Sequence, residues 1–98
     1  MIRDFGNKMA SDLFHKGTCK GLPRTHWRRA IHLLEVMDAV DSLAELKTQG
    51  FPPSIRLHQL KGERKNDFAI DIHKVSGWRI TFRFEDNEFA GVKIENYH

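Results

Sequence analysis

The last third of the chain, residues 68–98, decides the fold. Its centre is Gly77-Trp78-Arg79-Ile80-Thr81-Phe82-Arg83-Phe84, where apolar residues occupy every second position. That period is typical of a β-strand with one buried face. Residues 68–72 and 89–97 alternate in the same way, and the turn residues Ser76-Gly77 and Asp86-Asn87 separate the three runs. This stretch therefore predicts an antiparallel meander.

Before the meander, apolar residues recur at the spacing of about 3.6 residues that is typical of helices. Residues 7–16, 24–40 and 43–48 predict helices, the first ended by Gly17 and the last opened by a capping box between Ser42 and Glu45. Residues 55–60 alternate weakly, and residues 2–5 form a short edge strand or an extended lead-in. Helices followed by strands predict the α+β class, with the N-terminal helices packed on one face of a small antiparallel sheet.

Length and composition limit the organisation of the chain. Its 98 residues are expected to form a single domain over residues 1–98. The 16 Lys and Arg against 13 Asp and Glu give a net charge of +3, which favours an anionic partner. Cys19 is the one cysteine, and neither a signal peptide nor an apolar run of about 18 residues is present. We therefore expect a cytoplasmic protein with no membrane contact.

The polar face of the meander carries several charges. Because the apolar residues of 78–84 face the helices, Arg79 and Arg83 are expected to face solvent, beside Lys93, Glu95 and Tyr97 of the last strand. For Arg83, Lys93 and Glu95 the simpler interpretation is a solvated face whose charges pair across strands. The alternative is contact with an anionic polymer.

Two histidines give this face a chemical interpretation. His58 lies three residues before Lys61, and His98 ends the chain. Since histidine titrates near neutral pH, two histidines on one face can share acid and base roles in phosphodiester cleavage. Neighbouring cations can stabilise the charge that develops on the phosphate, and the nucleophile would be the 2′-hydroxyl of RNA. Alternatively, each histidine is an ordinary surface residue.

Other kinds of site lack a complete pattern. His15 and Cys19 have helical spacing, but glycines interrupt that segment and a second ligand pair is missing. Gly62 and Gly77 match no phosphate-binding loop. We therefore expect neither a metal nor a cofactor.

Three segments together resemble a known family. Arg56-Leu57-His58-Gln59-Leu60-Lys61-Gly62, the stretch 77–84 and the terminal Asn96-Tyr97-His98 are similar in order and spacing to the HigB toxins of the RelE-like superfamily. The resemblance implies a bacterial type II toxin that is a metal-independent, ribosome-dependent endoribonuclease cleaving mRNA. It also implies a helix-turn-helix, HigA-like antitoxin, which would carry the complex to operator DNA.

The resemblance assigns roles to single residues. His58 and His98 match the acid–base histidines, Lys61 and Arg79 the cations that stabilise the transition state, and Tyr97 a residue that stacks on or positions a base. Arg56, Arg83 and Lys93 are candidates for contact with the RNA.

One position departs from the family pattern. An acid commonly precedes Tyr-His, whereas this chain has Asn96, which is neither a base nor a negative partner for a histidine. Either the acid is dispensable, with Glu95 or the terminal carboxylate compensating, or the enzyme is slower. The alternatives to a nuclease are a ParE-like toxin of the same fold that poisons gyrase and a non-catalytic RNA-binding module.

Overall fold

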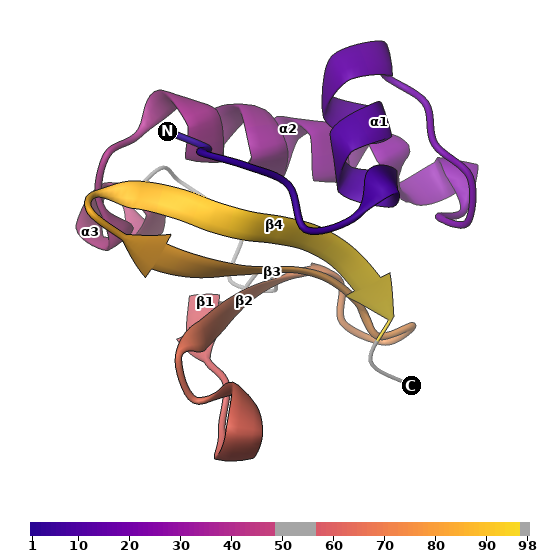
Figure 1. Ribbon diagram of the computed structural model, residues 1–98. Helices are drawn as coiled ribbons and strands as arrows, with labels where there is room; N and C mark the ends of the chain where they lie inside the picture. Colours follow the sequence, from indigo (N-terminus) through magenta and orange to yellow (C-terminus); the bar gives the residue numbers. More distant parts are fainter. Residues whose placement is uncertain (49–56, 97–98) are drawn as a thin grey trace.

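The computed structural model of the protein, which describes residues 1–48 and 57–96, has helices first and a sheet after them. The helices are α1 (Lys8–Lys16), α2 (Trp27–Ala39) and α3 (Leu43–Lys47), and the strands are β1 (Leu57–Gln59), β2 (Asp67–His73), β3 (Trp78–Glu85) and β4 (Glu88–Asn96). The strands follow the order β1-β2-β3-β4, and each neighbouring pair is antiparallel. Helices α1 and α2 lie over one face of the sheet (Figure 1). The predicted α+β class is confirmed.

The helix ends follow the sequence signals. The Asn7 side chain accepts a hydrogen bond from the Ala10 amide at 3.1 Å, and Gly17 ends α1 in the left-handed region at φ 77°. At α3 the hydroxyl of Ser42 accepts from the Glu45 amide at 3.0 Å, which is one half of the predicted capping box. Across the described residues, no helix has the length and apolar character needed to cross a membrane.

The predicted helix 24–40 differs from the structure in its first turn. Residues Arg24–His26 form a 3₁₀ turn, η1, and the α-helix begins at Trp27. The His26 amide donates to the Pro23 carbonyl at 2.9 Å, and the indole of Trp27 donates to the Leu22 carbonyl at 2.9 Å. These two bonds hold the entering chain in the tighter turn that often precedes an α-helix.

The core lies between the helices and the apolar face of the sheet. Ile80 and Phe82 of β3 are buried there as the alternation predicted, and Trp78 and Phe84 pack against the same cluster. The rings of Phe82 and Phe89 meet edge to face, with centroids 5.2 Å apart. Because the helices cover this face, the intervening residues of each strand point away from them.

A tight turn and a bulge shape the hairpin of β3 and β4. Asp86 and Asn87 both have positive φ, 52° and 63°, as the two central residues of a type I′ turn require. The register shifts between Thr81 and Arg83, where Gly91 adopts φ 60° on the opposite strand. The extra residue therefore lies on β4, whereas Arg79, Thr81 and Arg83 keep the regular alternation of β3.

The N-terminal segment protects the edge of β4. Ile2 pairs with Phe89 and Phe5 with Val92 in isolated parallel bridges. The segment expected to be a short edge strand or an extended lead-in therefore lies along β4 without forming a strand of its own. The Arg3 amide donates to the Phe89 carbonyl at 2.8 Å. An uncovered strand edge can pair with another chain, and the N-terminal segment covers this edge of β4. Strand β1 forms the opposite edge of the sheet. The weakly alternating segment 55–60 is a strand over Leu57–Gln59, and Ile55 and Arg56 lie outside the described residues.

Candidate active site

The sheet face that points away from α1 and α2, called here the open face, brings several predicted site residues together. Strand register places His58 opposite Ala69, Ala69 opposite Thr81, and Thr81 opposite Lys93. The next row on the same face lies two residues further along each strand and consists of Asp71, Arg79 and Glu95. Four strands therefore contribute to one surface that combines a histidine, cations and carboxylates.

His58 lies on this face at the edge of the sheet. It is half-buried in β1, two strands away from Thr81, which corresponds to about 10 Å between their backbones. The backbone of Arg79 is then about 12 Å from that of His58 by the same spacing. His58 and Arg79 therefore lie on the same face of the sheet, on its first and third strands.

Arg79 is half-buried, so the prediction of a fully solvent-facing arginine was wrong. Its side chain is 16% exposed and lies 3.9 Å from the Glu95 carboxylate. The register places Asp71, which is 9% exposed, on its other side. Alternation identifies the face to which a side chain points, but burial on that face depends on what covers it. Carboxylate-bearing residues thus flank Arg79 on both neighbouring strands.

Arg64 completes this cluster, and the sequence had indicated no role for it. It belongs to the 3₁₀ turn η2 (Gly62–Arg64) between β1 and β2, and its Nη1 donates to Oε1 of Glu95 on β4. Its Nε donates to Asp67 at 3.0 Å. Arg64 therefore ties the turn that follows Lys61 to the strand that ends at Asn96. The three-residue spacing of Arg64 and Asp67 was a weak signal for the local pair, whereas the contact with Glu95 spans 31 residues.

Glu95 is a poor candidate for the missing acid–base group. Burial raises the pKa of Glu95, but the hydrogen bond and the charge of Arg64 outweigh burial, so the pKa lies below its ordinary value. Hydrogen bonding to Glu95 raises the pKa of Arg64 in turn, against the opposing effect of burial. A carboxylate with a lowered pKa is a weak base, so we interpret Glu95 as the anionic partner of Arg64 and Arg79.

Asn96 has a structural role at the end of β4. Its side-chain amide donates to the Ser76 carbonyl at 3.0 Å and so joins β4 to the turn between β2 and β3. A carboxylate cannot donate this hydrogen bond. The residue that departs from the family pattern thus anchors the strand end from which Tyr97 and His98 follow.

The remaining predicted residues separate into three groups. Lys61 is exposed, immediately before η2, where its side chain is accessible to a ligand on the open face. Arg83 pairs with Glu85 on its own strand at 3.6 Å, beyond the bulge, and Lys93 is half-buried beside Gly6. Arg56, Tyr97 and His98 lie outside the described residues.

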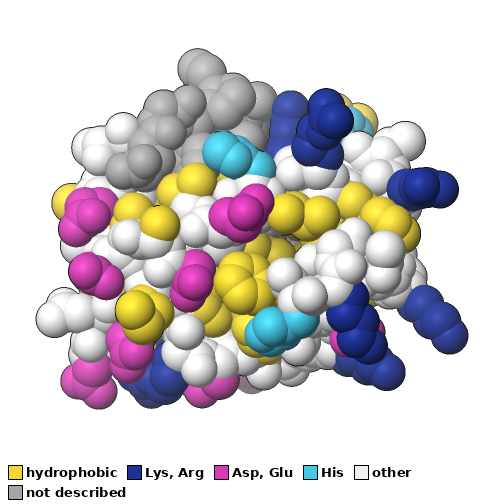
Figure 2. Space-filling model, turned by 90° about the horizontal axis from the view of Figure 1, so that it is seen from above, with side chains coloured by type: hydrophobic (Ala, Val, Ile, Leu, Met, Phe, Trp, Pro, Cys, Tyr) yellow, Lys and Arg dark blue, Asp and Glu magenta, His cyan; other side chains and the backbone are white. Residues whose placement is uncertain are grey.

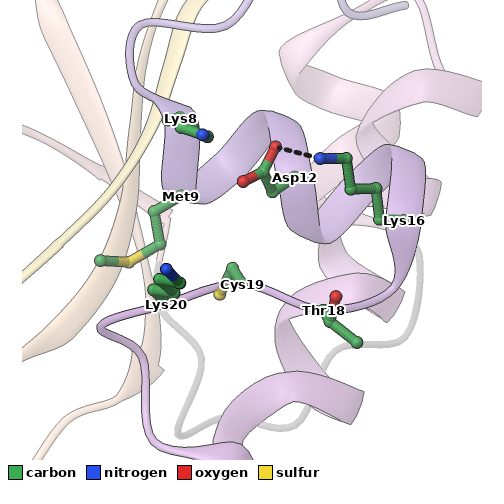
Figure 3. Close-up of a pocket in the computed structure, with 7 residues that line it drawn as sticks. All are labelled: Lys8, Met9, Asp12, Lys16, Thr18, Cys19 and Lys20. Carbon is green, nitrogen blue, oxygen red and sulfur yellow. Dashed lines mark ion pairs between the residues drawn. The ribbon is translucent and has the colours of Figure 1, made fainter.

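A separate depression lies between α1 and the loop after it. It has a volume of about 390 Å³ and is lined by Lys8, Met9, Asp12, Lys16, Thr18, Cys19 and Lys20 (Figure 3). Asp12 and Lys16 form an ion pair at 3.6 Å across its rim. Burial and the nearby charge of Asp12 raise the pKa of Cys19 despite a hydrogen bond with the Leu22 backbone, so this thiol is a weak nucleophile at neutral pH. The depression shares no lining residue with the open face.

Metal ligands are not clustered in the part of the chain that the structure describes. Residues 1–48 and 57–96 hold no group of three or more His, Cys, Asp or Glu side chains arranged to bind an ion.

Replacing Arg64 by glutamine is expected to lower the free energy of unfolding by about 1–2 kcal/mol at pH 7, because Glu95 and Asp67 lose a charged donor. The lowered pKa of Glu95 means that its ion pair stabilises the fold above the unfolded-state pKa and that this contribution disappears as the pH falls through the folded-state pKa. The difference between wild type and variant should therefore shrink below about pH 4.3.

Urea unfolding at pH 7, 5 and 3 measures this difference. The matched control is Lys65→Gln, which removes an exposed cation from the next position. A stability difference that stays constant from pH 7 to pH 3, or that is absent at pH 7, would contradict the proposed ion pair.

Comparison with known proteins identifies the family. The family model described as "RelE-like toxin of type II toxin-antitoxin system HigB" matches residues 3–98. The chain is also 33% identical over 98 residues to Endoribonuclease HigB of Proteus vulgaris, with 100% of both chains covered. These matches confirm the resemblance based on three sequence segments. The chain belongs to the HigB family of RelE-like toxins of type II toxin–antitoxin systems.

Proposed function

We propose that this protein is an endoribonuclease that cleaves mRNA on the translating ribosome and so arrests bacterial growth. The open face carries the proposal, because His58 lies on the same surface as the half-buried Arg79. Family membership and the name of the Proteus vulgaris relative support the reaction class. The protein would act in the bacterial cytoplasm.

The proposed reaction uses the 2′-hydroxyl of the RNA as its nucleophile. The 2′-oxygen forms a bond to the adjacent phosphorus, the bond from phosphorus to the 5′-oxygen breaks, and a 2′,3′-cyclic phosphate and a 5′-hydroxyl result. One of His58 and His98 takes the proton of the 2′-hydroxyl, and the other gives a proton to the leaving 5′-oxygen. Since the reaction needs the 2′-hydroxyl, DNA is not a substrate.

The cations and Tyr97 would support this reaction without carrying protons. Arg79, held between Asp71 and Glu95, would stabilise the negative charge that develops on the non-bridging oxygens, with Lys61 approaching from η2. Tyr97 would stack on a base beside the cleaved bond. Arg56 and Lys93 would contact the RNA backbone, and Arg83, paired with Glu85, is the weakest of these candidates.

The partners follow from the type II class. Family membership implies an antitoxin, and we propose that it is a helix-turn-helix protein of the HigA kind. This antitoxin would neutralise the toxin and take the complex to operator DNA. A short neighbouring gene with a helix-turn-helix pattern is the corresponding genomic prediction.

Expression from a tightly controlled promoter tests the proposed function. Growth should stop, and primer extension should show new 5′ ends inside translated transcripts. Wild-type protein that accumulates in folded form while growth and messages stay normal would contradict the proposal. Arrested replication with intact messages would instead indicate a gyrase poison. Salt-dependent RNA binding without cleavage on programmed ribosomes would indicate a binding module.

A further inference from the structure

A groove at the start of α2 gathers basic and aromatic side chains outside the open face. It has a volume of about 780 Å³ and is lined by Thr25, His26, Arg28, Arg29, His32, Ile72 and His73. Two segments far apart in the sequence meet there: η1 with the first turns of α2, and the end of β2. This groove, called here the α2 groove, therefore presents two arginines and three histidines without an acidic residue among its lining.

The histidine rings of the α2 groove form a flat platform. His26 and His73 stack with centroids 4.7 Å apart and an angle of 28° between the rings. His73 Nδ1 lies 2.7 Å from the Ser76 hydroxyl, which fixes the orientation of its ring. Burial lowers the pKa of His26, and the nearby His73 and Arg29 lower it further, so the ring is neutral at pH 7. A neutral, oriented ring is suited to stacking on a nucleobase.

The arginines supply charge beside this platform. Arg28 and Arg29 are both exposed, and Arg29 also donates to the Ile72 carbonyl at 3.2 Å, which holds its stem across the groove. Figure 2 shows that most Lys and Arg side chains of the helix face gather toward one end of the molecule and most Asp and Glu toward the other. A planar guanidinium can bind two phosphate oxygens at once, so these residues match an anionic backbone.

The α2 groove lies close to the end of the strand that leads into the proposed catalytic residues. His73 contacts Ser76, and the carbonyl of Ser76 accepts the hydrogen bond from Asn96. Asn96 immediately precedes Tyr97 and His98 in the chain. RNA that crosses the open face at the end of β4 therefore needs only to pass the turn between β2 and β3 to reach the groove.

We propose that the α2 groove binds the sugar–phosphate backbone of single-stranded RNA, with Arg28 and Arg29 on phosphates and the His26–His73 pair stacked on a base. The proposal rests on the proposed function for its RNA substrate. It extends the binding surface beyond the open face. The RNA is either the message next to the cleaved bond or an exposed ribosomal strand, since the two share this chemistry.

Binding of an RNA that cannot be cleaved tests the groove separately from catalysis. The probe is a fluorescent 12-nucleotide RNA with 2′-O-methyl groups, titrated at several salt concentrations. The Arg28→Gln/Arg29→Gln variant should bind about five- to twentyfold more weakly, and the slope of log K against log salt should fall by about 1.4, for two lost phosphate contacts. The control is Lys8→Gln/Lys47→Gln, which also removes two exposed charges but should bind as wild type does.

A parallel titration with vacant small ribosomal subunits distinguishes the sources of the RNA. Weakening with both ligands indicates message, and weakening with the subunits alone indicates ribosomal RNA. Equal binding by wild type and variant to both ligands would overturn the proposal, and so would a variant that loses only antitoxin binding. A third outcome separates the two proposals. If the wild type cleaves no message, while the Arg28→Gln/Arg29→Gln variant still binds RNA more weakly than the wild type, the proposed function is refuted and RNA binding by the α2 groove is supported.

A second variant tests the stacked histidine pair separately from the arginines. His73→Gln keeps a polar side chain beside Ser76 but removes the ring that stacks on His26. It should weaken binding of the oligonucleotide without changing the salt slope, because stacking involves no counterion release. A changed slope, or unchanged affinity, would show that the ring pair is not the platform.

Discussion

The His58→Ala variant is expected to lose about 10²- to 10⁴-fold in the rate of message cleavage on programmed ribosomes and to permit normal growth. The reason is that His58 is the proposed proton carrier on β1, on the same face as Arg79. Without it, one proton transfer of the proposed transesterification lacks its side-chain proton carrier. Binding of RNA should change little, because the arginines and Lys61 are intact. The loss should therefore appear in kcat rather than in KM.

Single-turnover cleavage of a defined message, together with growth after induction, measures this effect. The matched control is His15→Ala, which removes an exposed histidine of α1 whose ring contacts Ser11 and Phe5 and lies off the open face. Far-UV circular dichroism and thermal unfolding establish that both variants fold. Cleavage by His58→Ala within about threefold of wild type would reject the acid–base role of His58.

The strands and helices could be predicted because burial of one face imposes a regular spacing of apolar residues along the chain. Phe82 and Ile80 had to face the helices once β3 was a strand, and Asp86-Asn87 fixed the turn that sets its register with β4. The 3₁₀ turn Arg24–His26 was not predictable, because it depends on hydrogen bonds to Pro23 and Leu22 in the preceding loop.

The same reasoning could not predict the cluster around Arg79. Alternation placed Arg79, Asp71 and Glu95 on one face, and cross-strand register then made them neighbours. Arg64 joins this cluster through Glu95, which it reaches from a turn whose composition is merely polar. A contact between residues 31 positions apart produces no regular spacing in the sequence. The position of Glu95 between Arg64 and Arg79 is therefore seen only in the three-dimensional structure.

Asn96 shows how a departure from a family pattern acquires a physical meaning. In the sequence it appeared as the loss of an acid, whereas in the structure its amide donates to Ser76. A carboxylate at this position would face a carbonyl oxygen and would be repelled by it. The strand end is thus held by a neutral donor, and the proposed mechanism assigns the proton transfers to His58 and His98.

Deletion of Tyr97 and His98 is expected to reduce message cleavage by about 10³-fold or more while lowering the free energy of unfolding by less than about 1 kcal/mol. The large effect on rate follows because one truncation removes the second proposed proton carrier and the proposed stacking residue together. The small effect on stability follows because β4 ends at Asn96, which already pairs with Trp78. The last pair of the β3–β4 ladder therefore survives the truncation, as does the bond from Asn96 to Ser76.

Cleavage assays and urea unfolding on the same preparations separate these two quantities. A chain of full length with Tyr97→Phe and His98→Gln is the matched control, since it keeps the terminal carboxylate in place while removing the hydroxyl and the titratable ring. Because the chemistry is assigned to His98, this control should be nearly as slow as the truncated chain and as stable as wild type. Full activity in the control combined with inactivity of the truncated chain would contradict the assignment of the proton transfer to His98.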